Sequence, residues 1–109
     1  MKKGDLWVVN FDPAIGHEFQ KIRLAVVVQS NKINSNLVTL LPLSSKIHKK
    51  TKDDIFITQT KQNRLLSDAI IKVTQISTFD KQRFINFVGS AENKTIKMVD
   101  SYLKKHFDL

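Results

Sequence analysis

Residues 16–23 form a polar segment with the side chains best suited to chemistry on a phosphate. Arg23 offers paired N–H donors and keeps its charge, so it could hold a phosphate group while negative charge builds on the oxygens. In the same segment, His17 could exchange protons near neutral pH, and Glu18 could act as a base or orient Arg23. A surface ion pair of Arg23 with Glu18 or Asp12 is the alternative. The residue types alone leave both interpretations open.

The net charge favours a polyanion as the partner of this segment. The sequence has a formal net charge of +8 over 109 residues, and such a field attracts polyanions with a strong dependence on salt. Nucleic acid is therefore the first partner to consider, although a lysine-rich surface can also serve solubility alone.

The sequence offers little for metal or thiol chemistry. It has no cysteine, which excludes a disulfide, a thiolate zinc site and a cysteine nucleophile. Its three histidines, at positions 17, 48 and 106, are scattered along the chain and make a poor metal site. We therefore expect the protein to use neither a metal ion nor another cofactor.

Length and composition predict a single domain over residues 1–109. The 41% hydrophobic content is enough for one core, and the chain is too short for two domains of ordinary size. The N-terminal residues run into a strand-like segment rather than an apolar signal region, and no apolar run approaches membrane-spanning length. We expect a soluble protein of the reducing cytoplasm that does not contact a membrane.

Short runs rich in β-branched and aromatic residues predict strands through the first three quarters of the chain. The expected strands cover residues 6–11, 24–29, 37–43, 55–58, 69–73 and 83–88. The run 24–29 is almost entirely apolar, which predicts a strand buried on both faces. Residues 44–52 are the most cationic stretch and predict a mobile basic loop.

The C-terminal segment changes to helical spacing. Ser90 can cap a helix whose apolar residues share one face, namely Ile96, Val99, Leu103 and Phe107. Several short strands followed by one terminal helix predict a small, strongly bent antiparallel barrel.

Three blocks of the sequence match a known pattern at fixed spacing. The first is GDLWVVNFDP at residues 4–13, which is followed by a G-x-E loop and then by Arg23 ahead of a valine-rich run. The others are LSS at residues 43–45 and TQISTFDK at residues 74–81. With these blocks the chain resembles the MazF/PemK family of toxins over nearly its whole length.

The resemblance implies a mainly β fold with a C-terminal helix, an SH3-like or CcdB-like antiparallel barrel that assembles as a homodimer. It implies a metal-independent endoribonuclease, an mRNA interferase, that cleaves single-stranded RNA at short sequences to a 2′,3′-cyclic phosphate and a 5′-hydroxyl. A cognate antitoxin protein restrains such a toxin by laying a disordered acidic or apolar tail along the dimer. DNA would be contacted only indirectly, through the antitoxin complex.

The resemblance also assigns residues to the reaction. Ser44 lies where similar toxins carry a catalytic threonine or serine, so we expect Arg23 and Ser44 to be catalytic, with Ser44 preferred over Ser45. Without the resemblance, a strand-end hydroxyl would more simply satisfy local backbone groups. Other polar residues near these positions are expected to contact RNA phosphates or bases, namely His17, Glu18, Gln20, Lys21, Ser45, Lys46, Lys49 and Gln75.

Several residues depart from the family pattern. Leu24 follows Arg23 where similar toxins usually have proline, and Phe19 stands where glutamine is frequent. In PemK-like toxins an arginine and an aspartate precede the T/S-x-D turn, whereas this chain has Lys72 and Thr74. An acid–base pair of that kind cannot form from these two positions, which favours the arrangement of Arg23 with a serine.

Two alternative functions share the same fold. A gyrase-inhibiting toxin of the CcdB type would bind a protein and catalyse no reaction, but such toxins end in Trp-Gly-Ile, whereas this sequence ends in HFDL. The other alternative is a catalytically inactive homologue that only binds RNA or an antitoxin, for which the substitutions around Arg23 are the main argument. The sequence leaves the RNA cleavage motif and the identity of the antitoxin open.

Overall fold

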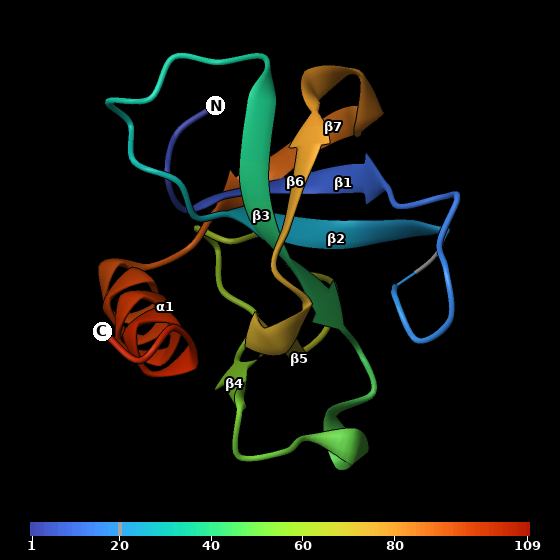
Figure 1. Cartoon of the computed structure of the whole chain (residues 1–109). Coiled ribbons are helices and arrows are strands. Elements are labelled where there is room, and N and C mark those ends of the chain that lie inside the picture. The colour runs from blue at the N-terminus through green and yellow to red at the C-terminus, as the bar shows by residue number, and fades with distance from the viewer. Residues whose placement is uncertain (20) are drawn as a thin grey trace.

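The computed structural model describes residues 1–19 and 21–109, which form an antiparallel β-sheet with a helix at its side (Figure 1). The strands are β1 (Asp5–Asn10), β2 (Ile22–Val27), β3 (Leu37–Ser44), β4 (Asp54–Ile57), β5 (Ala69–Lys72), β6 (Ser77–Asp80) and β7 (Phe84–Ser90). The helix is α1 (Asn93–His106), and short 3-10 helices are η1 (Ile47–Lys49), η2 (Val73–Gln75) and η3 (Lys81–Arg83). The predicted mainly β fold with a C-terminal helix is confirmed.

Strand β3 is the centre of the sheet because it pairs with three other strands. The strand order is β4-β5-β3-β2-β1-β7, and β6 pairs with β3 outside this path. Residues 37–40 of β3 pair with β6, whereas Leu43 and Ser44 pair with β5. The strand thus changes partner midway as it curves past β1 and β2 (Figure 1). Pro42, which has no N–H to donate, lies in the interval between these two ladders.

The sheet is bent like a barrel but is not closed. Its two end strands, β4 and β7, are not paired with each other in the described part of the chain. The loop before β5 lies against the end of β7 instead, where the backbone N–H of Ser90 donates to the carbonyl of Gln62 at 3.1 Å. This contact joins the open ends of the sheet.

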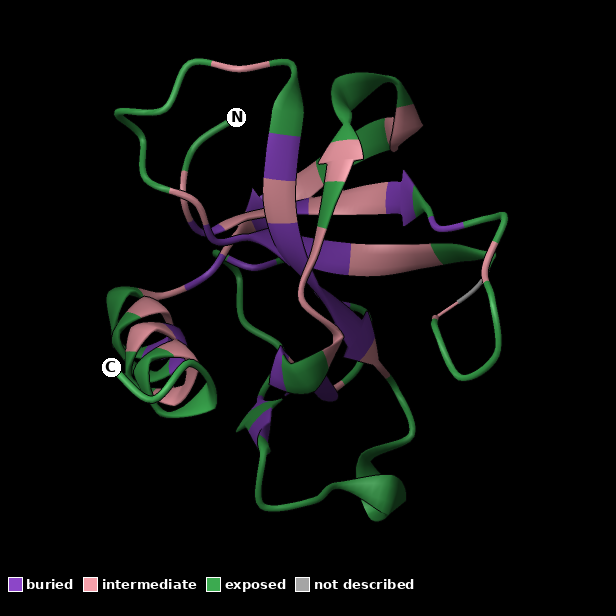
Figure 2. Cartoon of the chain, in the orientation of Figure 1, coloured by how far each residue is buried: buried purple, intermediate pink, exposed green. Residues whose placement is uncertain are grey.

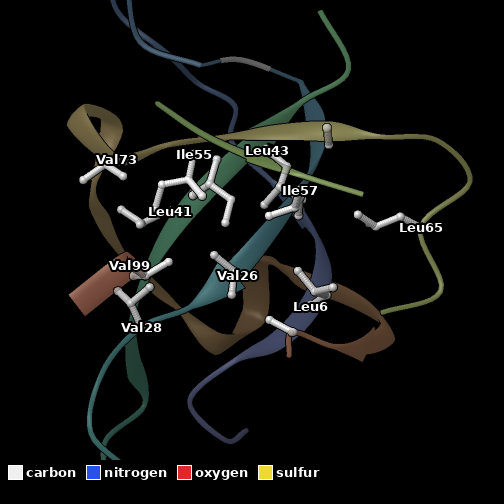
Figure 3. Close-up of a cluster of buried hydrophobic side chains, with 13 residues drawn as sticks. Leu6, Val26, Val28, Leu41, Leu43, Ile55, Ile57, Leu65, Val73 and Val99 are labelled. Atoms are coloured by element: carbon white, nitrogen blue, oxygen red, sulfur yellow. The ribbon is translucent and has the colours of Figure 1, made fainter. Parts of the chain in front are cut away.

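The buried face of the sheet follows the apolar pattern of the strands, and Figure 2 shows burial concentrated along β2 and β3. Alternate residues of β2 enter different clusters, because Ala25 packs with Phe11 while Val26 packs with Leu41 and Leu6. The prediction of a strand buried on both faces is therefore confirmed. Figure 3 shows the larger cluster, where side chains from the sheet meet Val99 of the helix.

The helix packs closely against the backbone at Gly4. Gly4 has a φ of +94°, and a Cβ at this position would lie 2.6 Å from Cδ1 of Ile96. The carbonyl of Gly4 also accepts a hydrogen bond from the N–H of Ala91 at 2.8 Å. Ile96, Val99 and Leu103 face the core, as the helical spacing predicts.

Three details differ from the expectation drawn from the sequence. Ser90 is the last residue of β7 and not the helix cap, because its N–H extends the strand edge and the helix begins after Glu92. Phe107 does not join the apolar helix face, because it follows the end of α1 and is 51% exposed. Strand β6 was not expected, since only Phe79 in it is apolar, and pairing with β3 forms it.

The basic segment 44–52 contains the single turn η1, with Lys49 at its end. Among the described residues, no helix is both long and apolar enough to cross a membrane.

Candidate active site

Arg23 and Ser44 come from adjacent strands and lie at the same end of them. Strands β2 and β3 pair with Ala25 opposite Pro42. Continuing this register by two residues on each strand leads to Arg23 and Ser44. Both side chains are half-buried, and both line the same two neighbouring cavities. The structure therefore brings together the two residues that the sequence assigned to catalysis.

The first of these cavities, here called the cationic cavity, has a volume of about 250 Å³. It is lined by Phe19, Arg23, Ser44, Lys46, Lys49, Ile70 and Lys72. Four of these seven side chains carry positive charge and none carries negative charge. Such a lining suits a phosphate group.

Phe19 supports Arg23 from the loop between β1 and β2. The guanidinium carbon of Arg23 lies 5.7 Å from the centroid of the Phe19 ring, within the range of a cation–π contact. The Phe19 ring itself packs against Phe11, which is buried, at a centroid distance of 6.4 Å. The departure from the family pattern at position 19 thus supplies a wall for the arginine.

Two carboxylates near Arg23 are used by the loop backbone. Asp12 Oδ1 accepts from the N–H of Lys21 at 2.7 Å, and Glu18 Oε1 accepts from the N–H of Ile15 at 2.7 Å. Lys21 has a φ of +66°, so the Asp12 contact stabilises a backbone conformation that lysine rarely adopts. These bonds shape the loop that leads into β2.

Ser44 ends β3 with its hydroxyl at the cavity wall. Its Oγ accepts a hydrogen bond from the N–H of Lys46 at 3.1 Å, which leaves the hydroxyl proton available for donation. Its neighbour Ser45 is exposed and does not line the cationic cavity. The geometry therefore favours Ser44 over Ser45 for contact with a bound phosphate.

The second cavity, here called the apolar cavity, has a volume of about 410 Å³ and lies on the other side of Arg23 and Ser44. Leu24 lines it, so the second departure from the family pattern also faces the site. The loop between β4 and β5 adds Arg64 and Leu66, which is 97% exposed. Arg64 has a φ of +57° and follows the buried Asn63. The side-chain amide of Asn63 forms hydrogen bonds with backbone groups of the loop and so holds its conformation.

A third cavity of about 240 Å³, here called the Gln75 cavity, lies beyond Phe19. Its lining includes Glu18, Gln75, Thr74 and the ring of Phe19, which therefore separates it from the cationic cavity. No lysine or arginine is among its described lining residues. Two residues predicted to bind RNA, Glu18 and Gln75, thus line the same cavity, and neither Arg23 nor Ser44 lines it.

The other residues predicted to bind RNA fall into two groups, those that line a cavity and those that do not. Lys46 and Lys49 line the cationic cavity, and Ser45 lines the apolar cavity. His17 and Lys21 are exposed on the loop and line none of the three cavities. Gln20 lies outside the described residues.

Comparison with known proteins gives the chain its family. A family model described as the PemK-like, MazF-like toxin of type II toxin–antitoxin systems matches residues 2–107. The chain belongs to this family. The resemblance that was drawn from the three sequence blocks is therefore confirmed.

Known relatives align with this MazF-like toxin over its whole length. Endoribonuclease MazF9 of Mycobacterium tuberculosis is 28% identical over 116 residues, which cover 100% of this chain and 98% of the relative. The solved structure of MazF from Deinococcus radiodurans has a TM-score of 0.86 at 19% identity, covering 100% and 97%. A mycobacterial endoribonuclease in complex with its cognate antitoxin has a TM-score of 0.78 at 12% identity, covering 100% and 96%. These structures share the fold.

The MazF-like toxin has site residues that the sequence did not reveal as such. Lys72 lines the cationic cavity and pairs with Asp54 at 2.8 Å, and Arg64 reaches the apolar cavity. Position 72 was noted only as a departure, and neither Asp54 nor Arg64 stands in a recognisable motif. Their placement depends on strand register and loop conformation, which no local pattern encodes. The described residues contain no group of three His, Cys, Asp or Glu placed to hold a metal ion.

Proposed function

We propose that this MazF-like endoribonuclease toxin cuts single-stranded RNA where the cationic and apolar cavities meet. The observation that carries the proposal is that Arg23 and Ser44, from adjacent strands, line both cavities. Family membership and the relative named as an endoribonuclease support the reaction class. The formal charge of +8 supports a polyanionic substrate.

The proposed reaction is a transesterification within the RNA. The ribose 2′-oxygen attacks the adjacent phosphorus, the bond from phosphorus to the 5′-oxygen breaks, and a 2′,3′-cyclic phosphate and a 5′-hydroxyl result. The 2′-hydroxyl gives up its proton to a base, and the 5′-oxygen takes up a proton as it leaves. Because the substrate supplies its own nucleophile, side chains that stabilise charge and move protons suffice without a metal ion.

Arg23 and Ser44 stabilise the phosphorane in this proposal. The Arg23 guanidinium binds two phosphoryl oxygens through its paired donors, and its charge offsets the negative charge that develops on them. The Ser44 hydroxyl donates to a phosphoryl oxygen or relays a proton. His17 on the exposed loop contacts RNA and is the candidate for proton exchange in this proposal, while Glu18 contacts RNA.

The remaining contacts divide by chemistry. Lys46 and Lys49 bind phosphates that flank the cut, while the Gln75 cavity accepts a base next to the Phe19 ring. Amide and carboxylate groups can read the edge of a base. Further RNA contacts are proposed for Gln20, Lys21 and Ser45.

We also propose a homodimer that a cognate antitoxin restrains in the cytoplasm, with DNA contacted only through the antitoxin complex. Solved relatives include a mycobacterial endoribonuclease with its cognate antitoxin and a MazE-MazF structure from Deinococcus radiodurans. The basic surface suits an acidic antitoxin tail, and Ile22 and Leu66, exposed at the apolar cavity, suit an apolar one.

Incubating the purified protein with single-stranded RNA in the presence of a chelator tests the proposed activity. Arg23→Ala and Ser44→Ala are each expected to lower kcat by about 100-fold or more, the cost of losing a donor to a developing oxyanion. Lys97→Ala and Ser101→Ala, at exposed positions of α1, are the matched controls and should cleave as the wild type does.

Each of the other outcomes contradicts part of the proposal. Wild-type binding of RNA without cleavage indicates an inactive homologue, and intact RNA with loss of DNA supercoiling indicates a gyrase inhibitor. Unchanged cleavage by Arg23→Ala refutes the assigned catalytic pair.

A further inference from the structure

Asp54 is a buried carboxylate paired with Lys72, a residue that lines the cationic cavity. The Asp54 side chain is 1% exposed. Oδ2 accepts from the N–H of Thr51 at 2.8 Å and from Nζ of Lys72 at 2.8 Å, while Oδ1 has no hydrogen-bond partner among the described residues. A buried carboxylate is costly unless a cation pairs with it. Lys72 supplies that cation.

Lys72 links this buried carboxylate to the cavity. Strands β4 and β5 pair with Asp54 opposite Lys72, so the two side chains meet across the ladder. The Lys72 side chain is 20% exposed and lines the cationic cavity together with Arg23 and Ser44. One end of the ion pair is thus sealed in the core, and the other faces the place where the substrate phosphate is proposed to bind.

Without a fixed counter-charge, the lysine side chains around the cavity would repel one another and move apart. Arg23, Lys46, Lys49 and Lys72 carry like charge around a volume of about 250 Å³, and flexible ammonium side chains separate when nothing holds them. Lys46 and Lys49 are exposed and form no ion pair with the described residues. Of the three lysines, Lys72 alone has an ion-pair partner among the described residues, and this partner holds its ammonium group in place.

We infer that Lys72 binds a phosphate oxygen of the RNA beside Arg23, and that Asp54 is the positioning residue that fixes Lys72 there. The inference rests on the proposed endoribonuclease activity of this site. Lys72 contributes charge and a hydrogen bond, and it forms no covalent bond with the substrate. The competing explanation is a structural ion pair, which stabilises the fold and leaves catalysis by the folded protein unchanged.

Kinetics of Asp54→Asn, Lys72→Met and the double variant separate these explanations on an RNA that the wild type cleaves. Each single variant should lower kcat/KM by about 10- to 100-fold, the effect of losing a hydrogen bond to a charged group. The double variant should be no slower than Lys72→Met, because Asp54 acts through Lys72. Lys72→Arg should restore most of the rate. Asp53→Asn changes the exposed neighbouring carboxylate and should cleave normally.

Thermal unfolding of every variant separates folding from catalysis. If a single variant leaves an unpaired buried charge and does not fold, the neutral double variant replaces it, because removing both partners is usually tolerated. Wild-type rates in Lys72→Met or in the double variant overturn the inference. An Asp54→Asn loss that persists undiminished in the Lys72→Met background also overturns it. If the wild type cleaves no RNA at all, the proposed function fails first and takes the inference with it.

Discussion

The cationic cavity and the Gln75 cavity share the ring of Phe19 as a wall, yet their linings differ in charge. Arg23 and three lysines line the first, while Glu18 and Gln75 contribute to the second, where the described lining includes no lysine or arginine. Cationic side chains suit phosphates, and amides and carboxylates can also read base edges. The difference suggests that a bound strand is divided at Phe19, with its phosphate on one side and a base on the other.

The two cavities also differ in the elements that supply their lining residues. Strands β2, β3 and β5 supply Arg23, Ser44 and Lys72 to the cationic cavity. The Gln75 cavity takes Glu18 from the loop after β1 and Gln75 from η2. Groups on paired strands are held more precisely than groups on loops, which suits them to chemistry. Loops can vary while the sheet is kept, which suits them to sequence recognition.

Among variants that test the division between the two cavities, removal of the shared wall should reduce cleavage most. Phe19→Ala deletes the cation–π support of Arg23 and joins the cavities, so kcat/KM should fall by about tenfold, the scale of such a contact. Phe19→Tyr keeps the ring and should stay close to wild type. Cleavage of one RNA by the three proteins provides the measurement. Equal rates for Phe19→Ala and wild type would remove the reason to treat the ring as a functional divider.

Gln75→Ala should change which RNA is cut rather than whether RNA is cut. The preference for one base near the cut should weaken by about tenfold, because a lost base-edge contact costs about 1–3 kcal/mol of discrimination. Sequencing the 5′-hydroxyl ends released from a random RNA pool measures the preference. Gln82→Ala, at an exposed position of η3, is the matched control. A uniform loss over all sequences would mean that Gln75 serves the chemistry and not recognition.

The placement of Arg23 and Ser44 at one site could be predicted because both residues stand in local blocks of fixed spacing. Arg23 opens a valine-rich strand and Ser44 closes another, so both positions follow from strand boundaries that apolar runs mark well. The sequence assigned Glu18 and Gln75 to RNA as well, but their separation from Arg23 depends on where the Phe19 ring packs. That packing is tertiary and leaves no trace in residue spacing.

Prediction from the sequence missed or misplaced features where pairing between distant residues determines the structure. The partnership of Asp54 with Lys72 arises from the register of β4 and β5, and neither residue stands out along the chain. Strand β6 has one apolar residue, so only its ladder with β3 reveals it. The cap expected at Ser90 was wrong because an edge hydrogen bond to Gln62 outweighs a local capping preference.

Loss of two cavity lysines should weaken RNA binding mainly through its salt dependence. In the double variant Lys46→Ala and Lys49→Ala, the slope of log affinity against log salt should decrease by about 1.4, or about 0.7 for each lost phosphate contact with a single strand. Binding of an RNA with a 2′-deoxy cut site, measured at several salt concentrations, gives this slope. Lys97→Ala with Lys104→Ala, both exposed on α1, should leave the slope unchanged.

Glu18→Gln should have the smallest effect and gives the sharpest test of the division between the cavities. Glu18 Oε1 accepts from the N–H of Ile15 at 2.7 Å, and a glutamine oxygen can accept the same bond, so kcat should stay within about twofold of wild type. The pH dependence of cleavage should also be unchanged, because Glu18 lines the Gln75 cavity and not the cationic cavity. A large loss of kcat with an altered acid limb would make Glu18 the catalytic base. The two cavities would then act as one site, with the Phe19 ring inside it.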